Sequence, residues 1–488
     1  MLAAGLLTFA SCNNDEDPII DQNQVQTEED AQVIRIAVAN AGDGLETRAG
    51  RPLFSSEAAQ TIDKVKVVIV DAYGQIQATK LFENWQSESS PYNEDGHGRE
   101  AVWKLSGDDK LADTENNATY RVYAIGYTSA GSMYDFTDFS SASTYYKLPV
   151  AKTIETSESF AAEEVFAGEI PAISVADGQI VTTVGGDENV LTLHRQVTGV
   201  IGYYTGIPTY ALGKAEDGTE GIQANKAIEN LKLRMVATNI NDKIVFDHFN
   251  QNVMINNGQN TEDRVDYVVN GMQNAAITPN AAMITGETNS LAMEADETGY
   301  LLYQINLKDW FPLGDVNEDG VLDENDAATV GGWNTPASVQ GATFKEGSVF
   351  AGEFLIPFAA IRANATPAPS SKTTLQLQLV KDDGSTVTPV RVWDIRLDAN
   401  DPQVYDDPSH IWAVSSTGSD EYTFEPQVDE DESAQYYSLV RNHLYTVGEK
   451  TSDAYDPETD DPEDLSKGMN LILRVNDNWE LIHRMEVE

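Results

Sequence analysis

The residue pattern that most clearly predicts chemistry is an acidic stretch from Asp315 to Asp326. Its side chains with oxygen ligands stand at positions 1, 3, 5, 9 and 12, and they are Asp315, Asn317, Asp319, Asp323 and Asp326. Val321 supplies a backbone carbonyl at position 7, and Gly320 permits a sharp turn at position 6. Because Ca²⁺ is a hard cation that takes about six to eight oxygen ligands, this spacing predicts a structural calcium site.

Position 12 distinguishes this stretch from an EF-hand loop. Asp326 stands where an EF-hand has a bidentate Glu, which resembles the calcium loop of dockerins. No strong second loop follows, so a complete dockerin module is not expected. The residues from Glu324 to Val330 are typical of a short helix. The alternative interpretation is an acidic turn around a glycine, without a cation.

Other chemical patterns are weak in this sequence. Cys12 is the single cysteine, which excludes an internal disulfide. The six histidines show neither His-x-x-x-His nor His-x-His spacing, so no zinc site is indicated. Motifs of P-loop proteins, dinucleotide-binding folds, α/β-hydrolases and H-E-x-x-H proteases do not occur. We therefore do not expect an enzyme, and a glycosidase-type pair of carboxylates is the remaining catalytic alternative.

The charge of the chain limits its partners. It has 79 acidic and 31 basic residues, for a formal net charge of −48. Nucleic acid and anionic lipid surfaces would be repelled, so neither is expected as a partner. Hydrophobic residues make up 41%, which is sufficient for packed cores. This composition suits a soluble extracellular surface and the binding of calcium.

The N-terminal segment resembles a lipoprotein signal peptide. Residues 1–10 are mostly apolar and are followed by Ser11 and Cys12, so residues 9–12 resemble a lipobox. We expect residues 1–12 to be the signal peptide and Cys12 to carry the lipid anchor, including palmitate. The positive residues usual before the apolar run are missing, which suggests a start slightly upstream. Residues 13–48 are expected to form an acidic tether and a first strand.

Short runs rich in Val, Ile, Thr and Tyr alternate with turn residues, which predicts an all-β fold. The clearest strand candidates are 33–39, 63–71, 120–127, 191–204, 230–236, 243–247, 299–307, 348–356, 374–380 and 390–397. Many short strands separated by turns favour β-sandwiches. We expect an N-terminal sandwich at 49–207 and a C-terminal sandwich, with the calcium loop inserted, at 208–468.

The C-terminal end predicts a strand that needs a partner. Within 469–488, one face carries Trp479, Leu481, Met485 and Val487 together with His483. The other face carries mainly charged residues. A mostly apolar face on a terminal strand is typical of an element that completes another sheet. The alternative is an ordinary strand of the same monomer.

Five landmarks, taken in order, resemble the fimbrillin family, the type V pilins. They are Cys12, the Arg48–Gly50 step, Glu163–Glu169, Leu191–Val200 around Arg195, and Val440–Val447 ahead of the strand with Trp479. The resemblance implies two transthyretin-like β-sandwich domains in tandem. It implies an outer membrane lipoprotein precursor that an arginine-specific protease cuts between Arg48 and Ala49, with Arg51 as the alternative site.

The same resemblance implies how such a protein assembles. Loss of the first strand opens a groove, and the donor strand of the next subunit fills it. Identical or related fimbrial subunits then join head-to-tail into a cell-surface fimbria that supports adhesion. The alternatives are a fimbrial tip adhesin and a surface glycan-binding lipoprotein. Aromatic residues that could line a glycan site are Trp85, Tyr92, Tyr134, Phe136, Phe139, Tyr145 and Tyr146.

Overall fold

The computed structural model shows an all-β fold, as the sequence predicts. It describes residues 32–39, 53–54, 62–91, 98–114, 119–128, 149–151, 160–182, 190–209, 228–238, 240–246, 254–255, 264–265, 267–272, 283–285, 298–358, 375–382, 384, 387–397, 411–416, 422–426, 438–467 and 470–476. Within these ranges the α-helices are single turns, α1 (Trp85–Glu88), α3 (Leu307–Trp310) and α4 (Glu324–Ala327). The 3₁₀ turns within the same ranges lie at Gly107–Asp109, Ile228–Asn230 and Ala337–Val339.

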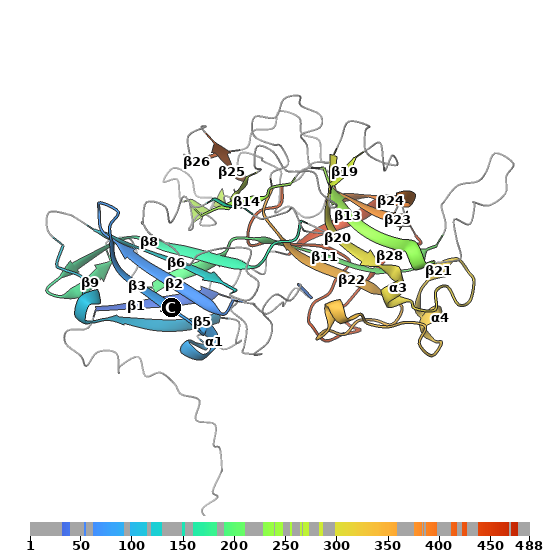
Figure 1. Cartoon of the computed structure of the whole chain (residues 1–488), viewed down its shortest axis with the longest axis horizontal. Helices are drawn as coiled ribbons and strands as arrows, with labels where there is room; N and C mark the ends of the chain where they lie inside the picture. Colours follow the sequence, from blue (N-terminus) through green and yellow to red (C-terminus); the bar gives the residue numbers. More distant parts are fainter. Residues whose placement is uncertain are drawn as a thin grey trace, which may run out of the picture.

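A nine-stranded sheet forms what we call the first unit, drawn in blue to teal in Figure 1. Its order is β3-β2-β6-β8-β10-β1-β5-β4, and β9 pairs with β8. The bounds are β1 (Gln32–Ala39), β2 (Lys64–Val70), β3 (Ile76–Phe82), β4 (Ser90–Pro91), β5 (Gly98–Leu105), β6 (Tyr120–Tyr127), β8 (Val165–Ala176), β9 (Gln179–Thr182) and β10 (Val190–Arg195). Most neighbours are antiparallel, but β1 runs parallel to β10.

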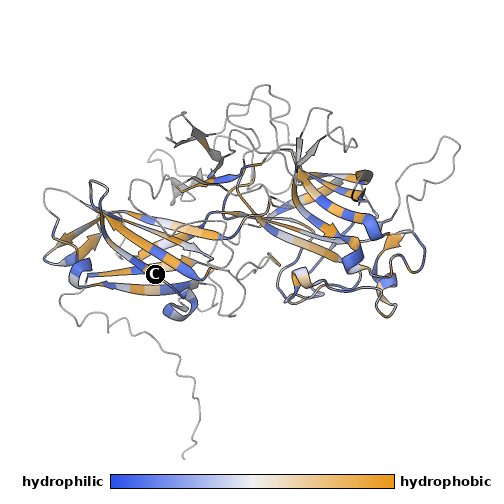
Figure 2. Cartoon of the chain, in the orientation of Figure 1, coloured by the Kyte–Doolittle hydropathy of each residue, from blue (hydrophilic) through white to orange (hydrophobic). Residues whose placement is uncertain are grey.

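The first unit closes around one hydrophobic core. Strands far apart in the sheet order, such as β1 and β2, contribute to the same buried cluster, so the sheet folds over itself. The cluster includes Ile34, Ile36, Val38, Val65, Val67, Ile69, Trp103, Leu191 and Leu193. These side chains recur at every second position, as one face of a strand requires. The alternation of hydrophobic and hydrophilic residues along the strands is visible in Figure 2.

A ten-stranded sheet forms the second unit, beside the first along the long axis of the molecule (Figure 1). Its order is β19-β20-β13-β23-β24-β29-β27-β11-β22, and β28 pairs with β11. The bounds are β11 (Thr198–Thr205), β13 (Leu231–Ala237), β19 (Met283–Thr285), β20 (Thr298–Asn306), β22 (Val349–Leu355), β23 (Leu375–Asp382), β24 (Val387–Leu397), β27 (Leu444–Val447), β28 (Glu463–Asp464) and β29 (Asn470–Asn476).

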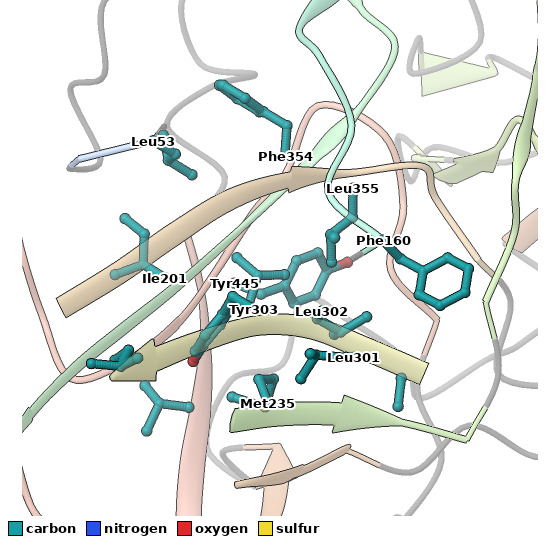
Figure 3. Packing of buried hydrophobic residues seen from close by; sticks show 14 of the residues in the cluster. Leu53, Phe160, Ile201, Met235, Leu301, Leu302, Tyr303, Phe354, Leu355 and Tyr445 are labelled. Atoms are coloured by element: carbon teal, nitrogen blue, oxygen red, sulfur yellow. The ribbon is translucent and has the colours of Figure 1, made fainter. Parts of the chain in front are cut away.

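The core of the second unit is dominated by large side chains from many strands. Figure 3 shows Met235, Leu301, Leu302, Tyr303 and Tyr445 packed together. The same cluster contains Leu53 and Phe160, although both precede the second sheet in sequence, and it extends to residues of β2, β6 and β8. The two units are therefore joined by continuous apolar packing.

Four small sheets complete the described secondary structure. They are β12 (Ile207–Pro208) with β21 (Val321–Leu322); β7 (Pro149–Ala151), β14 (Lys243–Val245) and β18 (Gly271–Met272); β15 (Met254–Ile255) with β16 (Arg264–Val265); and β17 (Tyr267–Val269), β25 (Ile411–Ser416) and β26 (Tyr422–Pro426). The β12–β21 pair ties the acidic stretch to the chain that leaves β11, and the amide of Thr209 donates to the carbonyl of Gly320.

The chain passes from one unit to the other within two residues. Strand β10 ends at Arg195 in the first sheet, and β11 begins at Thr198 in the second sheet. The second sheet therefore starts upstream of the border that we expected between residues 207 and 208. Only Gln196 and Val197 separate the two strands, and no Gly, Pro or Asn marks a turn between them in the sequence.

Candidate functional site

Strand β1 occupies an interior position in the first sheet. It pairs antiparallel with β5 along its whole length and parallel with β10 from Arg35 to Val38. The side chains of Ile34, Ile36 and Val38 are completely buried. Burial of each such side chain stabilises the fold by about 1.5–3 kcal/mol. Strand β1 is thus part of the core of the unit, although it lies N-terminal to the predicted cleavage step.

Two polar contacts fix the register of β1. Gln32 is buried, and its amide group donates to the carbonyl oxygen of Leu111 at 2.8 Å and accepts from the amide of Leu111 at 2.8 Å. On the other face, the guanidinium of Arg35 donates to both carboxylate oxygens of Glu100, at 2.9 and 2.7 Å. A bidentate pair and a reciprocal amide contact are both directional, so they oppose slippage of the strand.

The predicted processing residues lie before and between the first described segments of the chain, 32–39 and 53–54. Cys12, Arg48, Ala49 and Arg51 lie outside the described residues. Leu53 and Phe54 follow directly after them and are buried in the second unit. A Cβ atom on Gly352 of β22 would lie 1.8 Å from the carbonyl oxygen of Leu53, so this glycine allows the close approach of the two segments. Figure 3 shows Leu53 on the same side of the core as Phe354.

The C-terminal segment is partly described. Residues 470–476 form β29, which pairs parallel with β24 and antiparallel with β27 in the same sheet. This part of the expected 469–488 donor segment is therefore a strand of the chain's own second unit. Trp479, Leu481, Met485 and Val487 lie outside the described residues.

The acidic stretch forms a turn closed by hydrogen bonds to its own carboxylates. Asp315 accepts from the amides of Asp319 and Gly320, at 3.2 and 2.8 Å. Asp326 is completely buried and accepts from the amides of Val316 and Asp323, at 2.7 and 3.1 Å. Gly320 has a φ of +85°, the left-handed conformation that the position-6 glycine was expected to supply.

Helix α4 begins at the end of this turn, at Glu324, as the sequence suggests. Asp323 and Asp326 form a capping box. The side chain of Asp323 accepts from the backbone amide of Asp326, and the side chain of Asp326 accepts from the backbone amide of Asp323. The position-12 carboxylate of the predicted calcium motif therefore also caps the start of helix α4.

Negative charge is concentrated in this turn. Burial, and then the neighbouring carboxylates of Asp326 and Asp319, raise the pKa of Asp315 above its ordinary value. Burial and nearby acidic groups likewise raise the pKa of Asp323. A divalent cation would relieve this repulsion, and the set of oxygen ligands, Asp315, Asn317, Asp319, Val321, Asp323 and Asp326, is of the kind that calcium takes. Among the described residues, however, no group of three or more His, Cys, Asp or Glu side chains converges as a metal site.

Three of the sequence landmarks meet at the crossing between the two units. Glu164 and Arg195 form a buried ion pair, with Nε and Oε1 2.6 Å apart. The guanidinium of Arg195 lies 5.1 Å from the ring centre of Phe166 in the first unit and 6.0 Å from that of Phe354 in the second. These landmarks therefore build the joint between the units.

The Val440–Val447 landmark secures the other side of this joint. Arg441 donates to the side chain of Gln196 at 3.1 Å, and the amide of Asn442 donates to the carbonyl of Val197 at 2.9 Å. The amide of Gly199 donates to the carbonyl of His443 at 2.9 Å. Asn442 has a φ of +58°, which Asn tolerates better than most residues. Apart from the order of the landmarks, no pattern in the sequence predicted this joint.

The structure contains a polar cavity. It has a volume of about 430 Å³ and lies between the acidic turn and the segment that carries β28. Its lining includes Asp323, Glu324, Lys345, Glu463 and Lys467, so charged groups of both signs surround it. No aromatic residue lines it, so it lacks the stacking platforms typical of glycan sites.

Within the described residues, no helix has the length and apolar character needed to cross a membrane.

Comparison with known proteins gives distant structural likeness and no sequence match. No protein-family model matches the chain, and no curated protein matches it. A proposed cell adhesion protein from Bacteroides eggerthii is 12% identical, with a TM-score of 0.32, over 91% of this chain and 95% of that one.

Two fimbrial proteins from Porphyromonas gingivalis are similarly distant. The anchor protein Mfa2 is 9% identical with a TM-score of 0.29, over 81% of this chain and 95% of that one. The C-terminally truncated tip protein Mfa3 is 10% identical with a TM-score of 0.29, over 86% and 96%. Similarity at this level carries no conclusion about function, so the case for a function rests on the geometry of β1 and its surroundings.

Proposed function

We propose that this chain is a structural subunit of a cell-surface fimbria that supports adhesion and polymerises by strand exchange. The precursor is an outer membrane lipoprotein with two transthyretin-like sandwiches, and an arginine-specific protease cuts it between Arg48 and Ala49. The observation that carries the proposal is the interior position of β1. Among the described residues, β1 is the element that precedes the predicted cut, and its removal would divide the first sheet between β5 and β10.

Removal of β1 would create a site for another strand. The backbone groups of β5 and β10 that now pair with β1 would lose their partners, and burial of unpaired backbone groups is costly. The space filled by Ile34, Ile36 and Val38 would become an apolar slot next to Trp103 and the other core residues. An extended segment that brings both backbone groups and alternate apolar side chains restores what was lost.

The cut would release only the residues on its N-terminal side. Strand β1 lies on the N-terminal side, whereas Leu53 and Phe54 on the C-terminal side are buried in the second unit. The mature chain would therefore keep its new N-terminus next to β22. Removal of β1 need not disturb the core of the second unit, which is a useful property for a subunit that must stay folded while it assembles.

The donor is the segment after β29. Because Asn470–Asn476 already belongs to the chain's own second sheet, the exchanged strand is confined to residues 477–488. Insertion of this strand into the next subunit joins two different surfaces, so the contact does not close on itself and a filament grows. We further propose that calcium binds the acidic turn and makes the second unit more rigid.

The proposal is tested with purified full-length protein and a truncated chain that ends at Asn476. After trypsin removes residues 1–48, the full-length chain should form filaments visible by negative-stain electron microscopy. The truncated chain should be cut at the same bond and keep the same melting temperature as the full-length chain, but it should remain monomeric. Filaments of the truncated chain, or a full-length chain that stays monomeric after the cut, would contradict strand exchange through residues 477–488.

A further inference from the structure

The outer face of β5 presents a charge pattern that an incoming strand must match. In the β1–β5 register, Val33 lies opposite Lys104, Arg35 opposite Val102, and Ala37 opposite Glu100. Val102 is 43% exposed, which is unusual for a large apolar side chain in this fold. The face therefore has the order basic, apolar, acidic along β5, at the alternate positions Lys104, Val102 and Glu100.

The C-terminal segment carries the complementary order. Its charged face reads Glu480, Ile482 and Arg484, which is acidic, apolar and basic. Directly opposite residues on antiparallel strands interact most strongly, and opposite charges there stabilise the pair while like charges destabilise it. Placed antiparallel to β5, this face would set Glu480 against Lys104 and Arg484 against Glu100.

We propose that residues 479–486 of a second copy of this chain take the place of β1 in one register, with Trp479 at the position of Gln32 and Met485 at the position of Val38. This proposal rests on the proposed strand exchange and specifies its register and its partner. The direction is that of β1, because the backbone groups of β5 and β10 are spaced for a strand antiparallel to one and parallel to the other. Ile482 would then cover Val102.

Neighbouring registers are less favourable. A shift by one residue would turn the charged face of the donor into the core. A shift of the donor by two residues toward the start of β1 would place Glu486 opposite Glu100, and a shift by four would place Arg484 opposite Lys104. Both arrangements oppose like charges. A shift of the donor by two residues toward the end of β1 would place Glu480 opposite Val102 and Ile482 opposite Glu100, so no oppositely charged residues would face each other.

The inner face of the donor fits the slot with two differences. Leu481 would replace Ile34 and Met485 would replace Val38, both by apolar side chains. Trp479 would replace Gln32, and its indole N–H can donate to the carbonyl of Leu111, although the amide of Leu111 would lose its acceptor. His483 would replace Ile36 in the core, so His483→Ile should tighten binding.

The test measures binding of a fluorescent peptide of residues 477–488 to the chain that ends at Asn476, after trypsin has removed β1. This chain lacks a donor strand of its own, and its melting temperature before the cut is compared with that of the full chain. Reversal of one charge, Lys104→Glu in the chain or Glu480→Lys in the peptide, should weaken binding about fivefold or more, because an attraction becomes a repulsion. The two reversals together should restore binding to within about twofold of the original. The pair Glu100→Lys and Arg484→Glu should behave in the same way. The chain with Glu100→Lys also carries Arg35→Glu, so that the precursor keeps an ion pair at β1.

The outcomes separate the two proposals. Failure of the unchanged peptide to bind the cut chain would overturn strand exchange itself. Binding of the unchanged peptide together with no effect of any charge reversal would overturn the register and leave strand exchange standing. Melting curves of each chain variant before the cut show whether it is folded, and the Lys104→Glu chain, whose position is exposed, serves as the variant least able to disturb the core.

Discussion

The ion pair of Glu164 and Arg195 offers the most direct test of how the two units are held together. Both side chains are buried, and burial lowers the pKa of the Arg195 guanidinium although Glu164 acts to raise it. The substitution Glu164→Gln keeps the size of the side chain and removes its charge. Arg195, which lies between a phenylalanine of each unit, would then lose the carboxylate that it contacts at 2.6 Å.

The expected cost follows from this geometry. Removal of one partner of a buried pair destabilises a protein by about 3–5 kcal/mol. For a cooperative unit of this size, each kcal/mol lowers the melting temperature by about 2–4 °C, so Glu164→Gln should lower it by about 6–20 °C. Differential scanning calorimetry, with urea unfolding as a second measurement, would detect a change of this size.

The control replaces both charges by apolar groups. The double variant Glu164→Leu and Arg195→Met should have a melting temperature much closer to that of the original protein than the single variant has, because both charges of the pair are removed together. The reasoning would be refuted if Glu164→Gln changed the free energy of unfolding by less than about 1 kcal/mol, or if the double variant were as unstable as the single one.

Three further predictions concern processing, calcium and packing. Arg48→Ala should leave residues 1–48 attached after treatment with an arginine-specific protease and keep the protein monomeric, as size-exclusion chromatography would show; filaments formed with β1 retained would contradict it. Because the pKa of Asp315 is raised in the folded state, its charge opposes folding increasingly as the pH rises from its unfolded pKa through its folded pKa. Asp315→Asn should therefore raise the melting temperature in chelator at pH 7 and lower it in calcium, and the same sign in both conditions would argue against a calcium site. Gly202→Ala would place a Cβ atom 2.1 Å from the hydroxyl of Tyr303, and overpacking of this kind costs about 1–3 kcal/mol in urea unfolding; an unchanged midpoint would show that the hydroxyls of Tyr204 and Tyr303 can move apart.

Alternation along single strands was a reliable guide to the fold. The sequence predicted a strand at 120–127, and β6 spans these residues. In the predicted strand 63–71, Val65, Val67 and Ile69 stand at alternate positions, and all three lie in the core of the first unit. This worked because one buried face imposes a period of two on the sequence.

Other features are not visible in local sequence. Val68 and Val70 on the second face of β2 are buried as well, because that face packs against the cluster shared with the second unit. The crossing at Gln196 and Val197 has no Gly, Pro or Asn that would signal a turn, so composition does not mark where one unit passes into the other. The assignment of β29 to the chain's own sheet depends on pairing with β24 and β27, which are distant in sequence. The acidic spacing predicted the turn at Gly320, but spacing alone does not show where the carboxylates point.

The placement of Leu53 and of β1 has a consequence for how the chain folds. Ile36 in the first unit pairs with Leu191, and Leu53 lies against Gly352, so the N-terminal part depends on residues synthesised much later. Contacts between such distant positions slow folding, because long loops must close before the contacts are made. A growing chain would therefore carry an unfinished sheet with open edges until β10 appears, and it could not complete its second sheet until β29 is made. We expect folding to begin late and to be slow, and a holding chaperone to improve the yield of the native protein.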